Sequence, residues 1–276
     1  MAEFPSSESY WRFAQSVKLK ARFVHDNEVR DFLGIVLESS VSRRKRLQKD
    51  SLLFRAQRGS TPRTEKSGEE EFDVPRAHPP ERMSPKAECV GDGRANPKGI
   101  PCLYLASNQN TAMAEVRPWV GSYVSLAQFK VMHDCMVVDC SLDERRWIFY
   151  PGPGEVDAAA IEAKVWGEIA YALSKPVALD ESHSDYVPTQ ILAEAFRNHG
   201  YDGIIYRSLL DKRGKNIALF DVKAAELINC GLYETKSVSF EFEQADNPYF
   251  VVKHYPEIEK SPAADESAEP PSAQNV

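Results

Sequence analysis

The stretch that decides the fold begins with GRANPKG at residues 93–99 and continues with LYLA at 103–106 and NTAMAE at 110–115. The first part is a basic turn enclosed by glycines, which let a ligand approach the backbone closely. The second part alternates an aromatic side chain with leucines and predicts a short strand. The third part predicts a short helix that carries one glutamate. A guanidinium, an aromatic ring and a carboxylate therefore occur within one turn–strand–helix segment.

The elements on either side of this segment predict an α+β fold. Apolar runs indicate strands over 51–58, 102–106, 126–131, 136–139, 203–206, 217–220 and 237–243. Helical spacing indicates helices over 26–48, 161–172 and 188–200, the first of them ending in the basic run RRKR at 43–46. The order of elements has no regular βαβ rhythm, and no Rossmann or P-loop glycine pattern occurs. We expect a mixed or antiparallel sheet core with flanking helices.

Composition shifts divide the chain into three parts. Residues 1–50 are expected to form an N-terminal helical extension, and residues 51–245 a single main domain. Within that domain, residues 60–93 form a polar insertion that is too long for a simple connection. Residues 257–276 are rich in Pro, Ala, Ser and Glu and are expected to be a disordered tail.

Charge and cysteine content exclude several classes of protein. The chain has 276 residues, a net charge of −7 and a pI near 5.5, which argues against direct nucleic-acid binding. No apolar run is long enough for a membrane helix, and the first residues lack a signal-peptide core. The five cysteines are odd in number and match no zinc spacing, so we expect reduced thiols, no bound metal and a cytoplasmic location.

Two arginines are candidates for binding an anion. Arg55 lies in the apolar strand LLFRAQR at 52–58, where an unpaired cation is costly. It either forms a structural salt bridge or holds a carboxylate or diphosphate by parallel hydrogen bonds. Arg94, in the glycine-rich turn, is either a ligand contact or part of an ordinary surface loop.

Three further residues are candidates for a site near the turn. Tyr104 is either a half-buried strand aromatic or a stacking surface for a ligand ring. Glu115 lies among apolar residues and either pairs with an arginine or stabilises positive charge that develops on a substrate. Ser208 follows a predicted strand, where ligand groups are common, although a lone serine is equally typical of a loop.

The order of these residues resembles the RES domain family, which is named for its Arg, Glu and Ser. The matching motifs run from residue 50 to residue 222: FR at 54–55, GRANP at 93–97, LYLA at 103–106, AMAE at 112–115, DY at 185–186, Gln190, and YDGIIYRS at 201–208. The resemblance implies a fold similar to ADP-ribosyltransferase toxins. It also implies an enzyme that consumes NAD, with members that act as toxins of toxin–antitoxin pairs.

Residue roles follow from the same resemblance. Arg55 and Arg94 would hold the NAD phosphates, and Tyr104 would lie against the nicotinamide end. Asn96 would also bind the substrate. Glu115 would stabilise the ribosyl cation or orient the attacking water or phosphate, and Ser208 would bind the nicotinamide ribose. Two more residues would line the pocket, namely Gln190 and Tyr206. NAD is the substrate in this scheme, and no metal takes part.

The resemblance leaves several alternatives open. The family turn carries Trp where this chain has Ala95, which changes the shape of the pocket. Water or inorganic phosphate would be the acceptor in a glycohydrolase or phosphorylase, and a protein would be the acceptor in an ADP-ribosyltransferase. A non-catalytic nucleotide-binding module is a further alternative. An antitoxin partner and self-association are both compatible with the sequence.

Overall fold

The computed structural model describes residues 3–143, 157–175 and 183–246. The chain divides into two compact units, Met1–Val238 and Ser239–Val276. The first unit holds all the helices and strands described below. In the second unit, residues 239–246 have no regular secondary structure, and the expected tail at 257–276 lies outside the described residues.

The core of the first unit is an eight-stranded mixed sheet. Its strands are β1 (Arg44–Leu47), β2 (Leu52–Arg58), β5 (Leu103–Ala106), β6 (Tyr123–Val131), β7 (Cys135–Asp139), β8 (Gly203–Arg207), β9 (Lys215–Leu219) and β10 (Ala225–Glu234). They are ordered β1-β7-β8-β9-β5-β2-β6-β10, and only β7 and β8 run parallel. Neighbours β2 and β5 share a single register pair, Phe54 with Ala106, so these two strands separate beyond that point. The predicted α+β class is confirmed.

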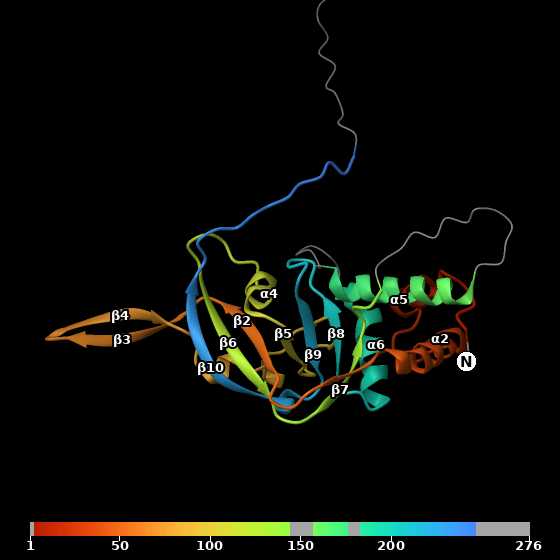
Figure 1. Ribbon diagram of the computed structural model, residues 1–276, viewed down its shortest axis with the longest axis horizontal. Coiled ribbons are helices and arrows are strands. Elements are labelled where there is room, and N and C mark those ends of the chain that lie inside the picture. Colours follow the sequence, from red (N-terminus) through yellow and green to blue (C-terminus); the bar gives the residue numbers. More distant parts are fainter. Residues whose placement is uncertain (1–2, 144–156, 176–182, 247–276) are drawn as a thin grey trace, which may run out of the picture. The chain divides into compact units, whose positions relative to one another are not determined.

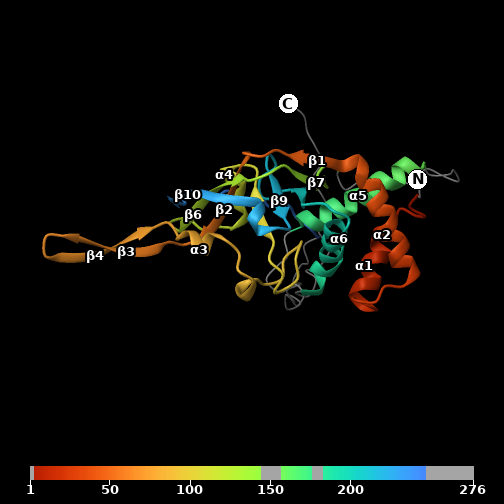
Figure 2. The ribbon, with the colours of Figure 1, turned by 90° about the horizontal axis from the view of Figure 1, so that it is seen from below.

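Helices cover the sheet unevenly. They are α1 (Ser9–Leu19), α2 (Asn27–Ser39), α3 (Pro80–Met83), α4 (Gln109–Glu115), α5 (Ala158–Ser174) and α6 (Val187–Asn198). Figures 1 and 2 show α1, α2, α5 and α6 grouped beside β7 and β8. This group buries Phe13, Phe32, Trp166 and Phe196 in one core with side chains of the sheet. Helix α4 packs separately, on β2, β5 and β6.

The expected helix over 26–48 is shorter in the structure. Helix α2 begins where predicted, because the side chain of Asp26 accepts a hydrogen bond from the backbone N–H of Val29 at 2.9 Å. It ends at Ser39, and the basic run that follows is not the end of a helix but a 3₁₀ turn (Ser40–Arg43) and strand β1. Pairing of β1 with β7 determines this conformation, and local sequence does not report a partner so distant in the chain.

The polar segment at 60–93 contains regular structure. Strands β3 (Thr61–Ser67) and β4 (Glu70–Arg76) form a separate two-stranded hairpin, which projects from the sheet in Figures 1 and 2. Its strands are joined by ion pairs such as Lys66 with Glu71. After the hairpin, the chain forms α3 and a 3₁₀ turn (Ala87–Cys89) before it reaches the basic turn.

The prediction of a strand over residues 237–243 is wrong, because these residues have no regular secondary structure. Among the described residues the last strand is β10, which pairs with β6 through a bulge between Leu227 and Asn229 and so lacks clean alternation. Residues 237–243 do alternate, but Phe240 and Phe242 are 75% and 89% exposed, because no neighbouring strand pairs with them. Alternation alone therefore indicated the wrong segment.

Candidate active site

The basic turn is fixed by a network of hydrogen bonds. The backbone N–H of Gly93 donates to the carbonyl of Asn96 at 2.9 Å, and the Asn96 amide donates to the carbonyls of Gly91 and Pro97 at 3.0 Å. From α6, Gln190 Nε2 donates to the carbonyls of Gly93 and Asn96 at 3.0 and 2.9 Å. The side chains of Asn96 and Gln190 therefore hold the turn, with Asn96 only 2% exposed.

Tyr104 supports the same turn from β5. Its hydroxyl donates to Asn96 Oδ1 at 2.7 Å and accepts from the backbone N–H of Ala95 at 2.9 Å. A Cβ atom at position 93 would lie 2.5 Å from this hydroxyl, so the turn needs Gly93. Burial, together with nearby Cys102, raises the pKa of Tyr104 well above its usual value, so the hydroxyl stays neutral.

Arg55 lies where β2 and β5 separate. Its Nη1 donates to the carbonyl of Tyr104 at 3.1 Å. Its Nε is buried and has no hydrogen-bond partner among the described residues. Burial lowers the pKa of this guanidinium. Within the described ranges no carboxylate forms an ion pair with Arg55, which is one of the residues that line an open space.

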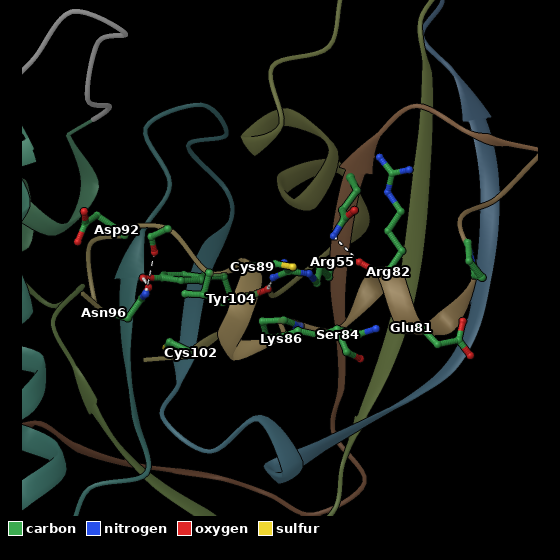
Figure 3. Close-up of a pocket in the computed structure, with 16 residues that line it drawn as sticks. Arg55, Glu81, Arg82, Ser84, Lys86, Cys89, Asp92, Asn96, Cys102 and Tyr104 are labelled. Atoms are coloured by element: carbon green, nitrogen blue, oxygen red, sulfur yellow. Dashed lines mark hydrogen bonds between the residues drawn. The ribbon is translucent and has the colours of Figure 1, made fainter. Parts of the chain in front are cut away.

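That open space is a cavity of about 570 Å³ (Figure 3). One wall carries Arg55 and Tyr104, and the turn contributes Gly93 and Asn96. The opposite wall comes from the segment after the hairpin. The residues of that segment with charged or reactive side chains are Glu81, Arg82, Lys86 and Cys89. Three cationic side chains thus line a cavity that also holds the carboxylates of Glu81 and Asp92.

Glu115 is the last residue of α4. The side chain of Asn108 caps this helix by accepting from the Thr111 N–H at 2.8 Å. At the other end of the helix, Glu115 Oε1 accepts from Ser208 Oγ at 2.7 Å and from Asn216 Nδ2 at 2.6 Å. The carboxylate is therefore held by two side chains that are 93 and 101 residues away in the sequence.

Glu115 faces a second, smaller cavity of about 150 Å³. Arg94 and Arg117 also line it, so two arginines and the glutamate line the same cavity. Arg94 donates through Nε and Nη2 to the carbonyl of Lys175. Arg117 has a positive φ of 46°, a strained conformation that is frequent at functional sites.

Tyr206 lies near enough to Arg94 and Glu115 for both to affect its pKa. It is buried at 3% exposure on β8. Burial raises its pKa, and Glu115 acts in the same direction, while a hydrogen bond with Arg94 opposes the shift. The Tyr206 hydroxyl therefore stays neutral.

The structure therefore separates the predicted site residues into two neighbouring groups. Arg55, Tyr104 and Asn96 line the large cavity, and Arg94 and Glu115 line the small one. The basic turn lies between them, because Asn96 and Arg94 face different cavities. Of the remaining predicted residues, Gln190 donates a hydrogen bond to the carbonyl of Asn96, and Ser208 donates one to Glu115. Tyr206 lies near Arg94 and Glu115.

Sequence reasoning missed Asn216 and Lys86. Asn216 lies in the strand KNIAL at 215–219. Because asparagine is uncommon in strands, its presence there could have indicated a site residue. Lys86 lies in the polar insertion, which shows no pattern that separates a site residue from other surface lysines.

Two classes of site find no support among the described residues. No group of three or more His, Cys, Asp or Glu side chains in the described ranges is arranged to hold a metal ion. Within the same ranges, no helix is long and apolar enough to span a membrane.

Comparison with known proteins identifies the family. A family model described as the RES domain matches residues 63–242. The chain belongs to the RES domain family. The matched range includes positions 94, 115 and 208 and begins after Arg55.

Other comparisons add little to the RES assignment. The chain is similar to one chain of the crystal structure of the M. tuberculosis MbcT-MbcA toxin-antitoxin complex, with 14% identity and a TM-score of 0.38. This similarity covers 72% of the present chain and 92% of that chain, and its score is too low to carry an argument. No curated protein matches the sequence.

Proposed function

We propose that this RES domain protein consumes NAD by breaking the bond between nicotinamide and ribose. The observation that carries the proposal is the carboxylate of Glu115, fixed by Ser208 and Asn216 at a small polar cavity. A fixed carboxylate next to a bond that breaks with development of positive charge stabilises the transition state without moving. Membership in the RES family and the family's link to NAD support the same reaction.

The reaction needs no redox partner. The pair of electrons in the N-glycosidic bond leaves with nicotinamide, whose ring nitrogen changes from positively charged to neutral. The ribose carbon is left as an oxocarbenium ion, which Glu115 stabilises by its charge. An acceptor with a lone pair, either water or inorganic phosphate, then attacks this carbon and loses a proton when it is water.

The large cavity supplies the binding surface for the rest of the dinucleotide. Arg55, Arg82 and Lys86 supply positive charge to this cavity, which suits a diphosphate. Arg94 belongs to the other cavity, so the two arginines act on different parts of NAD. The dinucleotide passes along the turn at 93–96 to reach both.

A product analysis tests the function and names the acceptor. The purified protein is incubated with NAD, with and without inorganic phosphate, and the products are separated by chromatography. Release of nicotinamide with ADP-ribose indicates water as acceptor, and a phosphorylated ADP-ribose that requires phosphate indicates a phosphorylase. Label from adenine-labelled NAD that stays on protein indicates an ADP-ribosyltransferase. NAD that binds without release of nicotinamide contradicts the enzyme and supports a binding module.

A toxin role is part of the same proposal. Depletion of NAD harms the cell that makes the enzyme, and the RES family includes toxins paired with antitoxins. We therefore expect growth arrest when the chain is expressed alone, with a fall in cellular NAD. Normal growth with active enzyme present would contradict the toxin role and leave the chemistry standing.

A further inference from the structure

Asn216 occupies an unusual place for an asparagine. It is the second residue of β9, a strand that pairs with β5 on one side and β8 on the other. It is 7% exposed. Asparagine is disfavoured inside strands, and a buried amide is costly unless it is hydrogen-bonded. The bond from its Nδ2 to Glu115 Oε1 at 2.6 Å compensates for this placement.

Ser208 is constrained to donate to the same oxygen. Its Oγ accepts hydrogen bonds from the backbone N–H groups of Leu210 at 3.2 Å and Asp211 at 3.1 Å. A hydroxyl has one hydrogen and two lone pairs, so these two bonds direct the hydrogen of Ser208 toward Glu115.

The loop at 208–214, which carries Ser208, is itself anchored to α4. Thr111 Oγ1, in the first turn of α4, donates to Asp211 Oδ2 at 2.7 Å. The backbone N–H of Ser208 donates to the carbonyl of Gly214 at 3.2 Å. A side chain at position 214 would collide with Thr111, so Gly214 lets this loop lie against the helix. These contacts fix Ser208 relative to Glu115, and the pairing of β9 with β5 and β8 fixes Asn216.

Both donors act on one oxygen of the carboxylate. Oε1 receives two hydrogen bonds, whereas no described residue donates to Oε2. A carboxylate held in this way cannot rotate without breaking both bonds, so its second oxygen keeps one direction. Glu115 lines the small cavity, where it is available to a ligand.

We propose that Asn216 is a positioning residue of this active site, which holds Glu115 so that Oε2 is directed at the reacting ribose carbon. This inference rests on the proposed NAD cleavage and assigns a role to a residue outside the Arg, Glu and Ser set. Ser208 acts with it on the same oxygen. Neither donor needs to touch the substrate.

The first test replaces Asn216 by leucine, which keeps the volume and removes the donor. We expect kcat for nicotinamide release to fall about 10- to 100-fold, the range typical when a group that orients a reacting ligand is removed. We expect KM to change less than about threefold, because the binding residues stay in place. Asn229 is the matched control, since it is a strand asparagine whose amide donates to Gln128 at 2.7 Å far from the site. Asn229→Leu should leave both constants unchanged.

A second variant separates positioning from a general loss of structure. Asn216→Asp has nearly the same shape, but its carboxyl donates a hydrogen bond only when it is protonated. We expect its activity relative to the natural protein to rise as the pH falls. The leucine variant has no such proton and should show the same relative activity at every pH. An aspartate variant that also lacks this rise contradicts the proposal.

A structural readout keeps this test independent of the reaction. If the natural protein releases no nicotinamide, the proposed function fails, and the role of Asn216 is then decided by the crystal structure of Asn216→Leu. The proposal predicts that Glu115 leaves its position or adopts several rotamers in that variant. An unchanged Glu115 side chain, or an unchanged kcat in an active enzyme, overturns the inference.

Discussion

Arg55→Met is the substitution that best separates binding from stability. In the natural protein the buried guanidinium makes one hydrogen bond, to the carbonyl of Tyr104, and has no carboxylate partner among the described residues. Loss of a hydrogen bond to a charged group costs about 1.5–3 kcal/mol. Removal of a buried charge from an apolar strand offsets much of this cost, because replacing buried charges by apolar side chains is often neutral or stabilising by about 1–4 kcal/mol. We therefore expect the free energy of unfolding to stay within about 2 kcal/mol of the natural value.

Binding should respond much more strongly than stability. If Arg55 contacts the diphosphate of NAD, the variant loses a charge-assisted interaction of about 2–5 kcal/mol. At about 1.4 kcal/mol for each factor of ten, the Kd for NAD should rise by at least about 30-fold. Titration calorimetry measures this Kd, and urea unfolding followed by tryptophan fluorescence measures the stability.

The exposed Arg58 of the same strand gives the control, since Arg58→Met should change neither quantity. The opposite pattern for Arg55→Met would refute the reasoning. An unchanged Kd with a loss of more than about 3 kcal/mol in unfolding free energy would make Arg55 a structural residue.

Three further predictions follow from the contacts around the site. Iodoacetamide should modify exposed Cys89, which lines the large cavity, and bound NAD should slow this reaction. Cys102 should resist iodoacetamide, because burial raises the pKa of its thiol to about 12. Peptide mass spectrometry measures both reactions, and modification of Cys102 before Cys89 would contradict the prediction. Gly93→Ala should lower the unfolding free energy by about 1–3 kcal/mol, because its Cβ would lie 2.5 Å from the tyrosine hydroxyl, whereas Gly91→Ala meets no atom within 4 Å and should be nearly neutral in the same urea titration. Burial alone would raise the pKa of Asp139, but hydrogen bonds from a neighbouring serine and two nearby lysines lower it overall, so its ionised form stabilises the fold above about pH 4. Asp139→Asn should therefore destabilise the protein at pH 7, and this effect should diminish as the pH falls below about 4. Equal destabilisation at pH 7 and pH 3 would be inconsistent with the lowered pKa.

Much of the sheet was predictable because its central strands are apolar. Strands β2, β5 and β8 bury leucine, isoleucine or tyrosine side chains, and their sequences indicate strands without knowledge of their partners. Strand β1 reads RKRL and is mostly exposed, so only its pairing with β7 makes it a strand. The same holds for the charged β3–β4 hairpin, where cross-strand ion pairs replace a hydrophobic face.

The sequence indicated several residues that line the two cavities, but not how these residues are arranged. The turn at 93–96 and Glu115 stand out in the sequence because their residue types are unusual for their surroundings. The division of the site residues between two cavities depends on side-chain alternation along the strands. In β2, Arg55 lies on the same face as Leu53, whereas Phe54 lies on the other face and packs with Ala106 under α4. Asn216 joins Glu115 only because β9 passes the end of α4, and no local pattern reports such a contact.

The most direct test of the central claim compares Glu115→Gln with the natural protein for NAD binding and for nicotinamide release. Glu226→Gln, an exposed change on β10, is the control and should behave as the natural protein does. The account predicts that Glu115→Gln binds NAD with nearly unchanged Kd and releases nicotinamide about 10²- to 10³-fold more slowly. Release at the natural rate would contradict the role of the carboxylate, and so would a loss of NAD binding large enough to explain the slower reaction.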